Sequence, residues 1–189
     1  MSDAEPPTLP DGRLGDSGWT LVETEAETVY RGLGVSVTGH TAVYEDAGLR
    51  DRIVATGGRD RVWWFFFATR LDIRPSPAAG LASAARPSVV RESKSAFAGE
   101  LADRGFRHVE LGDTESVGLD DHRARRSALR ARLPVAGGAV DVSGALVVWH
   151  DGGFRVAGGA YPTDSRAAWP DIDPDAYEDD LFDLIRAVA

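Results

Sequence analysis

Residues 61–73 read RVWWFFFATRLDI, and this stretch decides the fold. From Val62 to Ala68 seven consecutive residues are apolar and five of them are aromatic, so an extended segment here is apolar on both of its faces. Aromatic residues favour strands, and the glycines at 57–58 and the Pro-Ser-Pro at 75–77 are typical of the turns that bound one. The run therefore predicts a central strand of a sheet that is covered on both sides.

On the N-terminal side of this run, two alternating segments predict a hairpin. Trp19 to Tyr30 and Val35 to Tyr44 each alternate loosely between apolar and polar residues, and Gly32 and Gly34 separate them. Residues 45–54 follow the hairpin and carry apolar side chains at spacings of four and five. That spacing favours a short helix, and a third strand is the alternative.

On the C-terminal side, a loop and then a helix are expected. Residues 74–87 are rich in Pro, Ala and Ser without a clear period, which predicts a long surface loop or lid. The segment Ser93 to Arg104 predicts a helix, because Phe97 and Leu101 lie one turn apart. Gly105 stands where a left-handed C-terminal cap is typical.

After that helix the pattern returns to strands. Residues 108–111 predict a short extended run, and residues 112–121 predict an acidic connector. From Ala124 to Val135 the chain alternates strictly enough to predict a strand with one buried and one wet face. The apolar face carries Leu129, Ala131, Leu133 and Val135, and the polar face carries Arg126, Arg130 and Arg132.

The last third of the chain predicts a hairpin and a closing helix. The runs 140–150 and 154–161 flank Asp-Gly-Gly at 151–153, where glycine supplies the positive φ of a tight turn. The helix begins at Asp173, a good N-cap, with Pro174 at the first helical position. Its apolar stripe is formed by Tyr177, Leu181, Leu184, Ile185 and Val188.

These elements together predict the α+β class, an antiparallel sheet flanked by helices. The chain has 189 residues and is 43% hydrophobic, so a single domain of this size buries about 70% of the surface of its unfolded chain. Residues 1–18 are rich in Pro and Gly and carry no apolar period, which predicts a flexible N-terminal segment. We therefore expect one domain over residues 19–189.

The charged residues are unusual in kind as well as in number. Asp and Glu number 30 against 21 Lys and Arg, which gives a formal net charge of -9. Lys94 is the single lysine, and the chain contains no Asn and no Gln. This composition resembles that of cytoplasmic proteins from salt-loving archaea. In molar salt the Debye length is about 3 Å, so the self-repulsion of such a chain is largely screened there.

Several compartments and functions are disfavoured by the composition. The absence of cysteine removes disulfides, thiolate nucleophiles and cysteine-based metal sites. No apolar run reaches the roughly 20 residues that a membrane-spanning helix needs, and residues 1–5 lack the build of a signal peptide. We therefore expect a cytoplasmic protein that makes no membrane contact.

No pattern of catalytic or metal-binding residues stands out. The histidines, His40, His108, His122 and His150, lack the paired spacing of ligands on one helix face, and Asp120-Asp121-His122 most simply belongs to a surface loop. The chain has neither a GxSxG elbow nor a phosphate-binding glycine motif. The sequence therefore predicts no cofactor, no metal site and no catalytic residue, which leans against an enzyme without deciding the question.

Arginines 123, 125, 126, 130 and 132 form the single basic cluster of the chain. Arginine pairs bidentately with carboxylates and phosphates, so the wet face of the strand is a candidate partner-binding surface formed by Arg126, Arg130 and Arg132. The alternative is a solvated, salt-bridged sheet face. Nucleic acid is disfavoured as a partner by the net charge of -9 and the single lysine.

The order of the expected elements resembles the PsbP-like fold. Two early strands, an aromatic strand, a helix, an alternating strand, a glycine-turned hairpin and a closing amphipathic helix span residues 19–189 in that order. The resemblance implies an α/β/α sandwich, in which helices cover both faces of an antiparallel sheet. Members of that family, such as the extrinsic photosystem II subunit, act mostly as docking or accessory proteins.

The sequence thus leads to two hypotheses about function. The first is a non-catalytic protein-interaction or accessory module, which follows from the absence of catalytic signatures and from the resemblance. The second is a small-molecule-binding protein or a hydrolase with a pocket between the sheet and the loop 74–87. Neither hypothesis specifies an oligomeric state.

Overall fold

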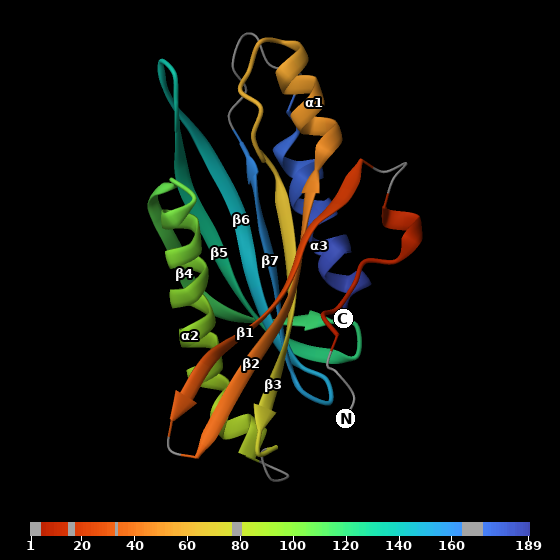
Figure 1. The fold of residues 1–189 in the computed structure, drawn as a ribbon, viewed down its shortest axis with the longest axis vertical. Helices are drawn as coiled ribbons and strands as arrows, with labels where there is room; N and C mark the ends of the chain where they lie inside the picture. Colours follow the sequence, from red (N-terminus) through yellow and green to blue (C-terminus); the bar gives the residue numbers. More distant parts are fainter. Residues whose placement is uncertain (1–4, 15–17, 33, 77–80, 164–171) are drawn as a thin grey trace.

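The structure is a computed structural model that describes residues 5–14, 18–32, 34–76, 81–163 and 172–189. Figure 1 shows its strands and helices along the chain. The strands are β1 (Trp19–Gly32), β2 (Val35–Asp46), β3 (Phe65–Arg74), β4 (Arg107–Leu119), β5 (His122–Val135), β6 (Gly138–His150) and β7 (Phe154–Pro162). The helices are α1 (Ala47–Ala55), α2 (Leu81–Asp103) and α3 (Pro174–Ala187), and a 3-10 turn spans Asp11–Arg13.

The seven strands form one sheet in the order β1-β2-β3-β7-β6-β5-β4, and every pairing is antiparallel. The predicted α+β class with an antiparallel sheet is therefore confirmed. The predicted central strand is β3, which lies inside the sheet between β2 and β7, but it begins at Phe65, so that Val62, Trp63 and Trp64 precede it. β1 and β4 are the two edge strands.

Helices pack on both faces of the sheet interior. Phe65 and Phe67 of β3 point to one face, where their ring centroids lie 6.4 and 5.1 Å from that of Phe97 on α2. Gly159 of β7 lies on the other face, where a Cβ added to it would lie 3.0 Å from Cδ1 of Leu181 on α3. The aromatic run is apolar on both sides because each of its faces meets a different helix.

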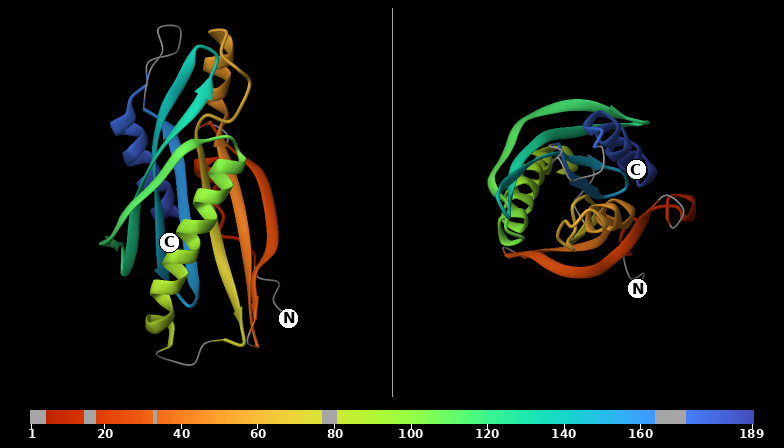
Figure 2. Two further views of the ribbon diagram at one scale, coloured as in Figure 1. Left: turned by 90° about the vertical axis from the view of Figure 1, so that its left-hand side faces the viewer. Right: turned by 90° about the horizontal axis from the view of Figure 1, so that it is seen from above.

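The sheet is strongly curved. Seen from above (Figure 2, right), the strands β4 and β5 arch over one side and β1 and β2 over the opposite side, with α2 lying between them. The view in Figure 2, left, also places α2 between β4 and β1. α2 therefore fills the space that the curved sheet encloses on that side, while α3 packs on the opposite face.

Several predicted elements are confirmed by the structure. The Asp-Gly-Gly at residues 151–153 joins β6 to β7, with Gly152 at φ 60°, and residues 47–55 form the short helix α1. α3 begins after Asp173, whose carboxylate accepts a hydrogen bond from the backbone N–H of Ala176 at 3.2 Å. Each of these elements is specified by residues close together in the sequence.

Two expectations about the middle of the chain are wrong. Residues 81–87, expected in a loop, are the first two turns of α2, and the helix includes Pro87. Residues 112–119, expected as a connector, belong to β4. Residues 83–87 and 112–118 are exposed or half-buried, so neither segment carries the apolar period by which helices and strands are recognised in a sequence. Residues 77–80 of the expected loop lie outside the described residues.

The N-terminal segment contacts the sheet. Leu9 is buried at 3% exposure, and its backbone N–H donates a hydrogen bond to the Tyr44 hydroxyl at 3.1 Å. Residues 5–14 are therefore attached to the domain, which differs from the expected flexible lead-in. One hydrophobic core extends from Leu9 to Val188. None of the described helices has the length and hydropathy needed to cross a membrane.

Candidate functional site

The predicted arginine surface lies on β5, and its three arginines share one face of the sheet. The register pairs Arg126 with Val147, Arg130 with Ser143 and Arg132 with Asp141, so the three side chains stand at alternate positions on the α3 side. Leu129, Ala131 and Leu133 point to the opposite face and are buried. The alternation predicted for this strand is therefore confirmed.

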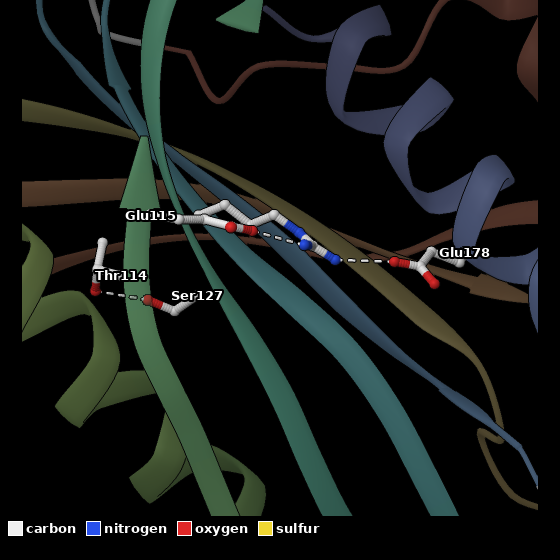
Figure 3. Close-up of polar contacts among 5 residues, drawn as sticks. Thr114, Glu115, Ser127 and Glu178 are labelled. Carbon is white, nitrogen blue, oxygen red and sulfur yellow. Dashed lines mark hydrogen bonds and ion pairs between the residues drawn. The ribbon is translucent and has the colours of Figure 1, made fainter. Parts of the chain in front are cut away.

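Arg126 does not face open solvent. Its Nη1 and Nη2 donate hydrogen bonds of 2.8 Å to Glu115 of β4 and to Glu178 of α3. Figure 3 shows these two glutamates reaching it from opposite sides. The guanidinium also lies over the Phe182 ring, 4.8 Å from its centroid, and the side chain is 22% exposed. Arg126 thus joins the edge of the sheet to α3, which is a structural role.

A hydroxyl pair lies beside this bridge on the opposite face of the same two strands. Thr114 and Ser127 share a hydrogen bond of 2.8 Å between their hydroxyl oxygens (Figure 3). Ser127 is 2% exposed, so the contact satisfies a buried polar group. Together with Arg126 it fastens β4, an edge strand, to β5.

The other two arginines remain at the surface. Arg132 is exposed and forms an ion pair of 2.9 Å with Asp141 on β6. Arg130 is exposed and stands opposite Glu110 of β4, and it forms no ion pair within the described part of the chain. Of the three predicted partner-binding residues, Arg130 is therefore the one whose charge is available. The docking role of the row stays a prediction.

The different environments of Arg126 and Arg130 lead to a stability prediction. Arg126→Glu places a third carboxylate between Glu115 and Glu178 and loses the contact with Phe182, so we expect the free energy of unfolding to fall by about 2 kcal/mol. Arg130→Glu places a carboxylate opposite Glu110, but both side chains are exposed, so it should cost less than about 1 kcal/mol. Urea denaturation of both variants measures the difference; equal losses would contradict the structural role of Arg126.

The histidines are dispersed over the structure. No three His, Asp or Glu side chains are grouped as metal ligands in the parts of the chain that are described. His122 is the first residue of β5 and follows the tight turn at Asp120 and Asp121, where Asp120 has φ 47°. The segment Asp120-Asp121-His122 is therefore a β-turn between β4 and β5.

A hollow that the sequence did not predict lies between the start of α1, residues 176–183 of α3 and Gly18. Its volume is about 740 Å³, and Trp64 and Tyr177 border it together with the carboxylates of Asp46, Asp180 and Asp183. Burial raises the pKa of Asp46; the hydrogen bond from the Leu49 N–H and the charge of Arg52 oppose this effect, and the charge of Asp180 adds to it. Burial also raises the pKa of Asp180, although Arg13 at 3.5 Å opposes that effect.

Asp46 also has a structural function, since its Oδ1 accepts the backbone N–H of Leu49 at 2.8 Å and caps α1. Its raised pKa means that ionised Asp46 reduces stability at neutral pH. The stability from this group is fully present below the ordinary aspartate pKa of 3.8 and is lost as the pH rises through the folded-state pKa. Asparagine at this position keeps the capping oxygen and removes the buried charge.

We therefore expect two substitutions of Asp46 to differ. Asp46→Asn should match or exceed the wild-type free energy of unfolding at neutral pH, whereas Asp46→Ala should lose about 1 kcal/mol with the cap. Asp46→Asn should also lack the gain in stability that the wild type shows on mild acidification. Denaturation curves over a pH series measure both effects. Equal destabilisation by Asn and Ala would show that the charge itself is required.

The first strand of the sheet is the most exposed element. Every residue from Thr20 to Arg31 is exposed, although β1 has 14 residues and its side chains alternate between the two faces. The described residues include five large apolar side chains that stand exposed. Four of them, Leu21, Val22, Val29 and Tyr30, lie on β1 at 45–57% exposure, and the fifth is Val54 of α1.

Both edge strands depart from regular pairing. In β1 the register shifts between Leu21 and Glu23 and between Thr28 and Tyr30, so that one extra residue is inserted at each place. In β4 similar shifts lie between Arg107 and Glu110 and between Leu111 and Thr114. Such bulges are typical of edge strands, where they limit pairing with other sheets. The regular part of β1 therefore lies between its two bulges.

A comparison with family models matches residues 6–189 to a domain of unknown function, DUF6517. The match includes the N-terminal segment that carries Leu9 as well as every strand and helix described above. Comparisons with curated proteins and with solved structures give no match.

Proposed function

The chain belongs to the DUF6517 family, and from this premise we propose that it is a non-catalytic protein-interaction module whose contact surface is β1. One observation carries the proposal: four of the five exposed large apolar side chains among the described residues lie on this single strand. Scattered exposed apolar residues are ordinary on a protein surface. Leu21 and Val22 lie near one end of β1 and Val29 and Tyr30 near the other, so a partner that covers the length of this strand would cover both pairs.

The position of β1 in the sheet supports the same proposal. The helices pack against the sheet interior, where β3, β6 and β7 are buried on both faces. β1 lies outside the part of the sheet that the helices cover, and its side chains from Thr20 to Arg31 are exposed to solvent on both faces. An edge strand of 14 residues without cover is exposed to aggregation unless a partner or a protective device is present.

The fold supports an accessory role. Helices on both faces of an antiparallel sheet are what the PsbP-like resemblance implies, and we propose that kinship, together with its α/β/α sandwich, as the evolutionary context of the chain. Arg130 and Arg132, on the other side of the molecule's curved sheet, are a second proposed contact surface for an acidic partner. A composition suited to high salt and a cytoplasmic location complete the proposal.

A small-molecule-binding function is the second candidate, and the hollow beside α3 is the observation that favours it. Two carboxyl groups with raised pKa, Asp46 and Asp180, border a space of about 740 Å³. Titratable groups with shifted pKa values are common in functional sites. This hollow lies apart from residues 74–87, where the sequence-based hypothesis had placed a pocket.

Site-specific photocrosslinking tests the interaction module. A photoreactive amino acid at Tyr30 should yield one defined adduct in cells that express the chain from its own promoter. The same amino acid at Val54, which is 41% exposed on α1, is the matched control and should yield none. Val29→Asp should abolish the Tyr30 adduct without lowering the melting temperature, because Val29 is 57% exposed.

The proposal is wrong if the positions 30 and 54 give the same adducts, or if neither gives any. In that case the hollow becomes the leading site. A thermal-shift screen of metabolites, with Asp180→Asn as the comparison variant, then tests small-molecule binding.

A further inference from the structure

The regular part of β1 is a short, open segment of sheet edge. Glu23 to Thr28 pairs residue for residue with Val43 to Thr38 of β2, and the bulges at Val22 and Val29 bound it on either side. Among the described residues β1 pairs with no strand other than β2. Every second residue therefore directs its backbone N–H and C=O away from the sheet, where an additional strand can bind them.

A row of three glutamates lies along this segment. Glu23, Glu25 and Glu27 stand opposite Val43, Thr41 and Gly39, at alternate positions, so they share one face. It is the face on which Phe65 and Phe67 contact α2, because Val43 pairs with Phe67 in the next strand. The glutamates therefore project toward the α2 side of the sheet.

The row has no basic partner of its own on β1. Burial raises the pKa of Glu25, and the neighbouring charges of Glu23, Glu27 and Glu100 raise it further. Arg104 of α2 opposes this effect, but its Nε already binds Glu100 at 2.8 Å. The three side chains therefore form an excess of negative charge beside an unpaired backbone edge.

The opposite face of the same segment carries small side chains. Thr24, Ala26 and Thr28 alternate with the glutamates and stand opposite Ala42, His40 and Thr38. The side chains of an added strand would alternate between the two faces of the sheet. Half of them would lie beside the glutamates, and the other half would lie beside this row of small residues. Small residues leave room for apolar side chains, and the exposed Leu21, which stands opposite Tyr44 on this same face, extends the apolar surface at one end.

A second copy of the chain is a poor occupant of this edge. Antiparallel pairing of β1 with β1 of another copy would bring the two glutamate rows together, and like charges directly opposite each other are destabilising. The other edge strand, β4, also carries acidic residues along its length, namely Glu110, Asp113 and Glu115. Charge complementarity instead favours a basic partner strand.

We propose that β1 accepts an extended segment of a partner protein as an eighth strand, and that this segment carries Arg or Lys at three alternate positions facing Glu23, Glu25 and Glu27. The inference rests on the proposed interaction function and specifies its partner. Backbone hydrogen bonds supply the binding, the alternating cations supply the specificity, and the glutamate row disfavours pairing between identical copies.

Synthetic peptides test this chemistry directly on the full chain. The probe is a short peptide in which three arginines alternate with valines. A peptide with glutamate in place of arginine tests the charge, and one with N-methylated amides on its pairing edge tests strand addition. Isothermal titration calorimetry at about 0.1 M salt, where the Debye length is about 10 Å, measures affinity.

We expect the arginine peptide to bind and the other two to fail. Glu23→Gln/Glu25→Gln/Glu27→Gln should weaken binding about 10-fold, as three exposed ion pairs predict. Asp60→Asn/Glu92→Gln/Asp121→Asn changes the net charge equally, from -9 to -6, and should leave the affinity unchanged. Binding should protect the outward-facing amides among residues 23–28 from hydrogen exchange, which non-specific attraction to an acidic protein does not do.

Each contrary outcome has its own meaning. Binding of the N-methylated peptide, or equal weakening by both triple variants, would overturn strand addition in favour of general charge attraction. Dimerisation of the chain through β1, seen by sedimentation, would identify a second copy as the occupant. A Tyr30 crosslink to a protein without a basic strand would overturn this inference and leave the interaction module intact, whereas loss of the crosslink removes both.

Discussion

Gly144→Ala is expected to lower the free energy of unfolding by about 3 kcal/mol, because the sheet has no room for the added methyl group. Gly144 of β6 stands opposite Ala160 of β7, and a Cβ at this position would collide with the backbone carbonyl oxygen of Gly159. The same Cβ would lie 3.0 Å from the Cα of Ala160. Backbone atoms in the middle of a sheet cannot rotate away as a side chain can, so the strands must separate.

A matched substitution in a helix should have the opposite sign. Gly99 lies in α2, and apart from its chain neighbours and the nearby backbone of its own helix nothing lies within 4 Å of the position that a Cβ would occupy. Gly99→Ala should raise the stability by up to about 1 kcal/mol, because alanine has the higher helix propensity. Urea denaturation followed by circular dichroism measures both variants. Equal effects of the two alanines would contradict the close approach of β6 and β7.

Trp64→Ala is expected to lose about 4 kcal/mol, the typical cost of emptying a large aromatic site. Trp64 is 2% exposed and precedes β3. Its ring lies 4.8 Å from that of Trp19, 4.5 Å from that of Tyr177 and 6.1 Å from that of Tyr161. It therefore joins the start of β1 to α3 and to β7, and no single neighbour can fill the cavity.

Trp64→Phe separates packing from hydrogen bonding at the same position. The buried indole nitrogen of Trp64 has no hydrogen-bond partner in the described part of the structure. Phenylalanine therefore loses ring area but no hydrogen bond, and the expected cost is about half that of alanine. Thermal and urea unfolding of both variants give the two values. A phenylalanine as costly as alanine would reveal a polar contact of the indole nitrogen.

The sequence determined those elements whose signal lies within a few neighbouring residues. Alternation in residues 124–135 correctly predicted that Leu129, Ala131 and Leu133 of β5 are buried, and the apolar stripe of α3 correctly predicted Leu181, Leu184 and Ile185 as core residues. Asp173 and the glycine turn before β7 marked the boundaries of their elements. The spacing of apolar residues within each of these elements is sufficient here, because it shows directly which side chains are buried.

Exposed elements could not be predicted in the same way. β4 and residues 83–87 of α2 bury little, so their residues carry no period that distinguishes them from a loop. The exposure of β1 on both faces could not be predicted from its sequence either, because its alternation of apolar and polar residues resembles that of an ordinary half-buried strand. Whether a strand is exposed on one face or on both depends on which part of the sheet the helices cover, and only the tertiary structure determines that.

The candidate sites follow the same division. The sequence identified Arg126, Arg130 and Arg132 and the face they share, because residues on a strand alternate with a period of two. Only the tertiary structure separated Arg126 from the other two, by bringing Glu178 to it across 52 residues of chain. It also placed the glutamates of β1 on an open edge and Asp46 beside Asp180, since burial and charge partners depend on contacts between distant segments that no local pattern records.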